Sequence, residues 1–79
     1  MKIKLYNDDI PKNIKFNKII AIDTEAMGLN HARDRLCLIQ ISNGDGVCFL
    51  IKINDIKKKP VNLLNILKNN EILKIFHYA

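Results

Sequence analysis

Runs of apolar residues separated by polar breaks predict a sheet built around one buried strand. Four consecutive apolar residues within Lys18–Asp23, mostly β-branched, are typical of a strand buried on both faces. Leu36–Ser42 predicts a second strand, with Gln40 as a buried polar residue in its interior. Val47–Ile51 predicts a third strand. Asn43–Gly46, between the last two, supplies the Asn, Asp and Gly residues of a tight turn, so these strands form an antiparallel hairpin.

The remaining segments predict one helix and two further strands. Met1–Leu5 alternates apolar and basic residues, which predicts a short peripheral strand, and a polar connector follows as far as about Asn17. Lys52–Lys59 predicts a charged surface loop. Pro60 suits a first helical turn, and the apolar stripe after it predicts a helix that ends near Asn69. Ile72–Phe76 predicts a fourth core strand.

This order of elements predicts an α/β fold with a mixed sheet. Three antiparallel strands are followed by a crossover helix and a fourth strand that runs parallel to the first. One helix can cover only one face, whereas strands this apolar need cover on both. The chain is therefore expected to be a single partial domain over residues 1–79, with its core at 18–79 and an amino-terminal strand and connector at 1–17.

Composition narrows the class of protein without deciding it. The 79 residues are 48% hydrophobic and carry a formal net charge of +5, which suits a nucleic-acid partner. A compositional bias toward Lys, Ile and Asn would give the same charge, so both explanations stay open. Cys37 and Cys48 lie in apolar strands and lack metal-binding spacing, which predicts buried free thiols. Because the chain has no transmembrane or signal-peptide run, we expect a soluble, cytoplasmic protein without a membrane partner.

Two carboxylates at the end of the first core strand are the strongest chemical signal. Asp23 and Glu25 point to the same side if the strand stays extended through Thr24. Two hard oxygen ligands on one side form half of a Mg²⁺ or Mn²⁺ site. A turn or a helix cap is the alternative that the Asp-Thr-Glu motif alone would favour. The loop that follows contains Gly28, which permits a close approach between backbone and ligand.

The residues on either side of the two carboxylates resemble the motifs of a known family. Ile20–Glu25 followed by Arg35–Ile41 resembles the first motif and second strand of ribonuclease D-like 3′–5′ exonucleases. These enzymes belong to the DEDD exonuclease superfamily and have a ribonuclease H-like fold. Ile72–Ala79 resembles the approach to the second motif, in which a His-x-x-x-x-Asp pattern carries the third acidic residue. The resemblance runs in order from Lys18 to Ala79, as the amino-terminal part of the domain.

The resemblance implies an enzyme that hydrolyses phosphodiester bonds at the 3′ end of RNA or DNA, with RNA favoured, and hence a role in RNA processing. Asp23 and Glu25 would be the catalytic residues and the ligands of two Mg²⁺ or Mn²⁺ ions, with Asp23 bridging both. Thr24, Met27 and His77 would contact the substrate. For Met27, core packing is an equal alternative, and for His77 a structural hydrogen bond is the alternative that its place at the end of an apolar strand favours.

The chain departs from the family pattern in its number of acidic residues. The family site uses four acidic residues and a Tyr or His general base, of which the last two acids and the base would lie beyond Ala79. Asp34, Asp45 and Asp55 stand in the wrong contexts to replace them, and Lys57–Lys59 is better explained as a solvated loop than as a phosphate contact. Three hypotheses follow: a fragment of an exonuclease, a catalytically inactive remnant with weak nucleic-acid binding, or one half of a split enzyme. In the last, a second polypeptide carries the remaining motifs.

Overall fold

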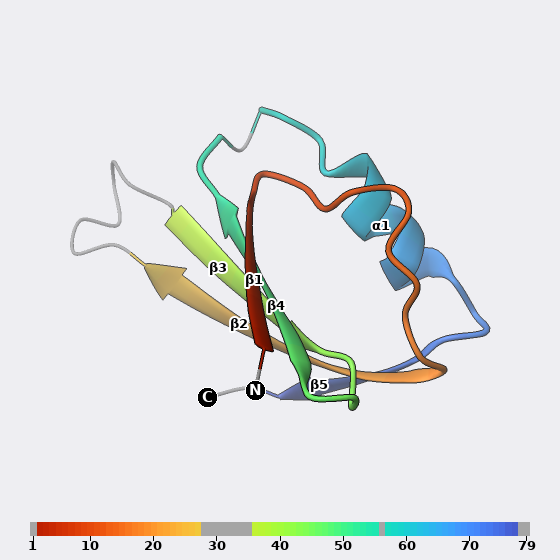
Figure 1. The fold of residues 1–79 in the computed structure, drawn as a ribbon. Coiled ribbons are helices and arrows are strands. Elements are labelled where there is room, and N and C mark those ends of the chain that lie inside the picture. Colours follow the sequence, from red (N-terminus) through yellow and green to blue (C-terminus); the bar gives the residue numbers. More distant parts are fainter. Residues whose placement is uncertain (1, 28–35, 56, 78–79) are drawn as a thin grey trace.

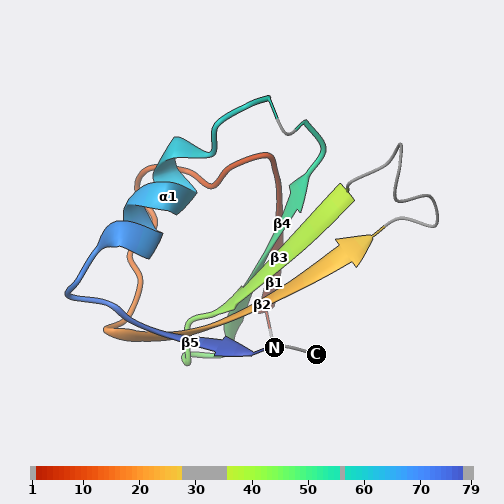
Figure 2. The same cartoon turned by 180° about the vertical axis from the view of Figure 1, so that it is seen from behind.

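A computed structural model describes residues 2–27, 36–55 and 57–77, with the backbone alone at residues 26–27, 36–37 and 77. Over these ranges the chain forms one sheet and one helix (Figures 1 and 2). In chain order the elements are β1 (Lys2–Asn7), β2 (Ile19–Met27), β3 (Leu36–Ser42), β4 (Val47–Ile53), α1 (Val61–Lys68) and β5 (Leu73–His77). Within the described ranges, no helix has the length and apolar character needed to cross a membrane.

The strands lie in the order β1-β4-β3-β2-β5. β3 pairs antiparallel with β2 on one side and with β4 on the other, and β5 returns after α1 to pair parallel with β2. β1 pairs parallel with β4 at the opposite edge. The predicted fold class, an α/β mixed sheet with three antiparallel strands, a crossover helix and a fourth strand parallel to the first, is confirmed.

The predicted turn joins β3 to β4 and is stabilised by its own side chains. Gly44 and Gly46 have φ angles of +79° and +84°, a conformation that residues with a Cβ rarely adopt. The Asp45 carboxylate accepts hydrogen bonds from the Val47 backbone N–H at 3.0 Å and from the Asn43 side-chain amide at 3.1 Å. Local sequence is therefore sufficient to specify this hairpin.

Because of strand pairing, several strands end at other residues than the sequence pattern predicted. β2 stays extended through Thr24 to Met27 because β3 pairs with it along this length, with Thr24 opposite Ile39. β4 continues to Ile53, where a surface loop was predicted, because β1 and β3 pair with it on its two sides. α1 begins after Pro60, and β5 ends one residue later than predicted.

The core lies between one face of the sheet and a layer made of α1 and the connector after β1 (Figure 1). The connector was predicted to be polar, but Ile10 within it is 3% exposed, and Ile14 and Phe16 pack against the core. Cys48 is a buried free thiol as predicted, and the side chain of Cys37 lies outside the described residues. The buried apolar cluster consists of Ile10, Ile20, Ile22, Ile41, Phe49, Ile51 and Leu63.

The connector also holds the start of α1. Pro60 precedes the helix and provides no side-chain cap. Instead, the Asp9 carboxylate accepts the backbone N–H groups of Asn62 at 3.1 Å and Leu63 at 2.9 Å. The Asn62 side chain donates back to the Ile10 carbonyl at 2.8 Å. Asp9 is far from α1 in the sequence, yet its carboxylate accepts backbone N–H groups of the first helical turn that would otherwise lack partners. An acidic side chain at this position also interacts favourably with the positive end of the helix dipole.

Asp8, next to Asp9 at the start of the connector, ties the connector to the residues that follow β4. It has a φ of +69°, and one oxygen of its carboxylate accepts the backbone N–H groups of Asn54 at 2.7 Å and Asp55 at 3.1 Å. These bonds favour the charged form and lower the pKa of Asp8 below its ordinary value, with the Asn54 N–H as the largest cause. The start of the connector is therefore tied to two separate parts of the chain, to α1 through Asp9 and to the residues after β4 through Asp8.

Replacing Asp9 with Ala is expected to lower the free energy of unfolding by about 1–2 kcal/mol, because two helix-terminal N–H groups lose their acceptor. Urea denaturation followed by circular dichroism measures this change. Glu71→Ala is the matched control, since Glu71 is an exposed carboxylate outside the cap. Equal stability of the Asp9→Ala and Glu71→Ala variants would show that Asp9 does not act as the cap.

The opposite face of the sheet, which we call the uncovered face, has no described element packed against it. Strand alternation and pairing register assign to this face five large apolar side chains that are more than half exposed. They are Ile3 at 59%, Leu5 at 62%, Ile19 at 54%, Leu73 at 59% and Ile75 at 53%. Over the described ranges the one helix leaves this face open, as the element order predicted.

Candidate functional site

β2 carries the two predicted metal ligands on the uncovered face. Ile20 and Ile22 of this strand are buried in the core, with 1% and 2% of their surface exposed. Because successive side chains in a strand point to opposite faces, Asp23 and Glu25 project away from the core and lie on one side of the sheet. The strand is therefore rigidly held on its core side and presents two carboxylates on the other.

Asp23 lies in an unusual environment for a carboxylate. Asp23 as a whole is half-buried, yet its Oδ1 atom is fully buried and has no hydrogen-bond partner within the described part of the chain. A cavity of about 130 Å³ adjoins it and is lined by Ala21, Ile22, Asp23, Gln40 and Ser42. A buried carboxylate oxygen without a partner costs free energy unless a donor or a cation meets it. This oxygen is therefore suited to bind a cation, and Mg²⁺ and Mn²⁺ prefer such hard oxygen ligands.

Two polar residues of β3 belong to this site and were not predicted. Gln40 lies directly opposite Asp23 in the strand pairing, and Ser42 lies opposite Ala21. Gln40 is exposed, so its assignment as a buried polar residue is wrong: the residue sits on the uncovered face, where no described element covers it. Its position opposite Asp23 depends on the register between β2 and β3, which the sequence pattern does not specify.

Glu25 is exposed and follows Asp23 on the same face, where it pairs with Leu38 of β3. Thr24 lies between them and points to the opposite face, so only its backbone is near the two carboxylates. Within the described residues, no group of three or more His, Cys, Asp or Glu side chains is placed to hold a metal ion. The pair Asp23 and Glu25 is thus an incomplete ligand set over this part of the chain.

Other predicted site residues are only partly described. The backbone of His77 pairs with Asp23 at the end of β5, which brings this residue to the edge of the site. The side chains of His77 and Met27, and the predicted loop at Gly28, lie outside the described residues. Lys57–Lys59 is exposed.

Comparison with known proteins gives a family match and several similar structures. A family model described as 3′–5′ exonuclease matches residues 7–79. NrnC of Brucella melitensis is 47% identical, with a TM-score of 0.76 over 98% of this chain and 38% of that chain. A nuclease solved in its apo form is 39% identical, with a TM-score of 0.78 over 98% of this chain and 38% of its own. No curated protein matches.

These similarities concern a part of the longer nucleases. The chain spans about 38% of the length of the NrnC chain, and the arrangement is consistent with the ribonuclease H-like α/β fold that the sequence resemblance implied. NrnC has also been solved with bound Mg²⁺ and, separately, bound to pGG.

Proposed function

Since the chain belongs to the 3′–5′ exonuclease family, as part of a DEDD exonuclease domain, we propose that it contributes to an enzyme of the ribonuclease D type. The reaction is hydrolysis of phosphodiester bonds at the 3′ end of a nucleic acid, with RNA favoured over DNA. The main observation in support is the buried Oδ1 of Asp23, which has no hydrogen-bond partner among the described residues and lies next to Glu25 on the open face of the sheet. The pGG bound to NrnC supports a nucleic-acid ligand for that relative and, by similarity, for this chain.

In this proposal Asp23 and Glu25 hold Mg²⁺ or Mn²⁺, with two ions in the complete site. The oxygen donor set suits these hard cations, and the Mg²⁺ bound to NrnC supports the same metal here. When bound, such ions stabilise the charge that develops on the phosphate and activate the attacking water. The chain itself contributes rigidity, because Ile20 and Ile22 anchor β2 in the core and limit the movement of both carboxylates.

The substrate contacts proposed from the sequence are Thr24, Met27 and His77. The position of Thr24 favours a contact through its backbone, and the pairing of His77 with Asp23 is compatible with a contact near the scissile phosphate.

The remaining acidic ligands and the general base would come from sequence outside these 79 residues. They would lie either in a longer chain or in a second polypeptide, so residues 1–79 would form one partial domain with its core at 18–79. A cytoplasmic location is part of the proposal, in line with the buried free thiol of Cys48.

A catalytically inactive remnant with weak nucleic-acid binding is the second candidate. It is favoured by the absence of a third acidic ligand near Asp23 and Glu25 among the described residues. The two candidates differ in whether Asp23 supports catalysis once the rest of an exonuclease domain is supplied. Activity of such a completed domain, with and without the Asp23 carboxylate, is therefore the deciding experiment.

Titration of Mg²⁺ into the 79-residue chain alone is expected to reveal no site tighter than about 1 mM, because two carboxylates supply too little ligand charge for tight binding. Isothermal titration calorimetry measures the affinity. Asp23→Ala should remove the weak signal that remains, whereas Glu71→Ala, at an exposed carboxylate away from the site, should leave it unchanged. A micromolar site that disappears in Asp23→Ala would contradict this expectation and would mean that further ligands from this chain complete it.

A further inference from the structure

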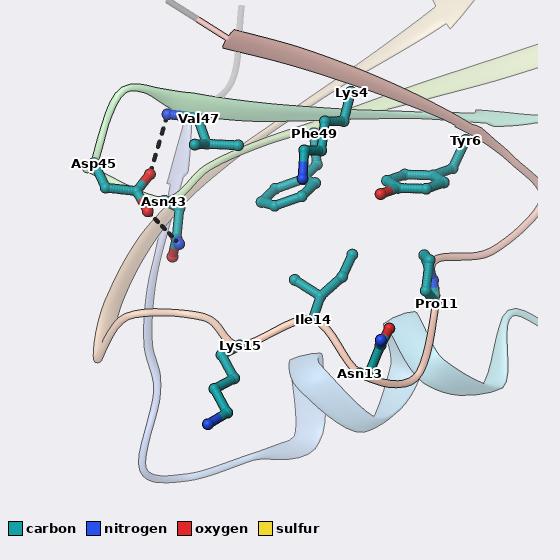
Figure 3. Close-up of a pocket in the computed structure, with 10 residues that line it drawn as sticks. All are labelled: Lys4, Tyr6, Pro11, Asn13, Ile14, Lys15, Asn43, Asp45, Val47 and Phe49. Atoms are coloured by element: carbon teal, nitrogen blue, oxygen red, sulfur yellow. Dashed lines mark hydrogen bonds between the residues drawn. The ribbon is translucent and has the colours of Figure 1, made fainter.

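A second, larger cavity lies on the helix-covered side of the sheet, on the face opposite Asp23 and Glu25 (Figure 3). We call it the connector pocket, because its walls come from the connector, β1, β4 and the hairpin. Its volume is about 440 Å³, within the range of small-molecule sites in proteins. It is lined by Lys4, Tyr6, Pro11, Asn13, Ile14, Lys15, Asn43, Asp45, Val47 and Phe49.

One wall of the connector pocket is aromatic and well packed. The ring of Tyr6 stacks with that of Phe49, with centroids 6.3 Å apart and an interplanar angle of 20°. Phe49 also meets Phe16 edge to face at 5.3 Å, and only 4% of its surface is exposed. Tyr6 is half-buried and retains an accessible side. This wall therefore offers a preformed aromatic surface for a flat ligand group.

A second wall is polar, and the side chains of Asn43 and Asp45 in this wall already have hydrogen-bond partners. Asn43 is 4% exposed, and its side-chain oxygen accepts the Asn17 backbone N–H at 2.7 Å. Its amide donates to Asp45, whose carboxylate also accepts the Val47 N–H. The negative charge of Asp45 is thus engaged by two donors, which reduces its repulsion of an anion in the pocket.

Three other polar side chains of the lining are not engaged by the pocket residues that Figure 3 draws. Figure 3 draws hydrogen bonds between the lining residues only at Asp45, so Lys4, Tyr6 and Asn13 make none with the other nine residues drawn. The Lys4 nitrogen is turned toward the cavity, whereas that of Lys15 extends away from it at the rim. The Lys4 ammonium, turned into a cavity whose Asp45 carboxylate is already engaged by two donors, favours an anionic ligand.

We propose that the connector pocket binds a nucleoside monophosphate. Its phosphate would pair with the ammonium of Lys4, its base would lie against Tyr6, and the Asn13 amide, with both donor and acceptor atoms, would meet the edge of the base. A bare anion would leave the aromatic wall unused, and a neutral nucleoside would leave Lys4 unpaired. The pocket lies on the opposite face from the carboxylates, so the site is independent of the proposed nuclease chemistry.

Titration of the 79-residue chain with adenosine 5′-monophosphate, followed by NMR chemical shifts in the presence of EDTA, tests the proposal. The chain carries Ile75→Lys, on the opposite face from the pocket, to limit association through the uncovered face. The chelator removes any contribution from metal at Asp23, so the result does not depend on the exonuclease proposal. Saturable shifts should centre on the connector pocket, with affinity for the monophosphate at least about tenfold higher than for adenosine or inorganic phosphate. Lys4→Gln should weaken binding about tenfold, and Asn13→Ala should also weaken it.

Lys2→Gln is the matched control, because Lys2 is an exposed lysine on the same strand that does not line the pocket, and its change should alter affinity less than about twofold. Three results would overturn the proposal: no saturation by the monophosphate up to about 10 mM, inorganic phosphate binding as tightly as the monophosphate, or equal weakening in Lys2→Gln and Lys4→Gln. Equal weakening in the two variants would mean that general surface charge, and not Lys4 in the pocket, accounts for binding of the monophosphate. NMR spectra of each free variant verify that its fold is retained.

Discussion

Asp23→Asn is expected to reduce exonuclease activity about 10²- to 10³-fold when the rest of an exonuclease domain is present. The suitable protein is a chimera in which this chain replaces the segment of NrnC that it matches, 38% of that chain at 47% identity. Asn keeps the shape of the side chain but removes the charge that would hold the cations. The loss of several kcal/mol of transition-state stabilisation corresponds to that change in rate.

The assay is release of nucleotides from the 3′ end of a labelled RNA in Mg²⁺ or Mn²⁺, with a DNA of the same sequence to compare substrates. Glu25→Gln should also impair activity, whereas Glu71→Gln removes the same charge after α1 and should leave the rate unchanged. An active chimera in which Asp23→Asn retains activity within tenfold would remove Asp23 from the metal site. A folded but inactive parental chimera would favour the second candidate, the inactive remnant.

The 79-residue chain by itself is expected to be marginally stable, to self-associate and to show no measurable exonuclease activity. Five large apolar side chains on the uncovered face are more than half exposed, and β1 and β5 form the two edges of the sheet. Exposed apolar surface and unpaired strand edges both favour association. Light scattering coupled to size exclusion should therefore give a mass above that of the monomer, and thermal melts should be of low cooperativity.

Ile75→Lys tests whether this face is responsible. Ile75 lies on β5 and is 53% exposed, and placing a charge there should weaken association at least about tenfold. Val61→Lys is the matched control, because Val61 is 52% exposed but lies on α1. A cooperatively folding monomer that digests RNA from its 3′ end would refute the prediction. Equal effects of both substitutions would assign the association to general hydrophobicity instead of the uncovered face.

Local sequence was sufficient to predict the helix and the strands, and to predict that both carboxylates lie on one side of the sheet. The apolar run of β2 and the two-residue period of a strand place Asp23 and Glu25 on one face. The hairpin at Asn43–Gly46 follows from residues that tolerate positive φ angles. The single amphipathic helix was enough to predict that one face would be left open. Each of these inferences depends on residues close together in the chain.

Contacts between distant segments were decided only by the tertiary structure. Asp9 caps α1 from a connector that looked entirely polar, and Ile10 beside it enters the core. Gln40 lies opposite Asp23 because of the pairing register between β2 and β3, and the connector pocket forms where the connector, β1, β4 and the hairpin meet. Periodicity encodes which face a residue occupies, but not which residue lies opposite it. That choice depends on long-range packing and on backbone hydrogen bonds that no local pattern contains.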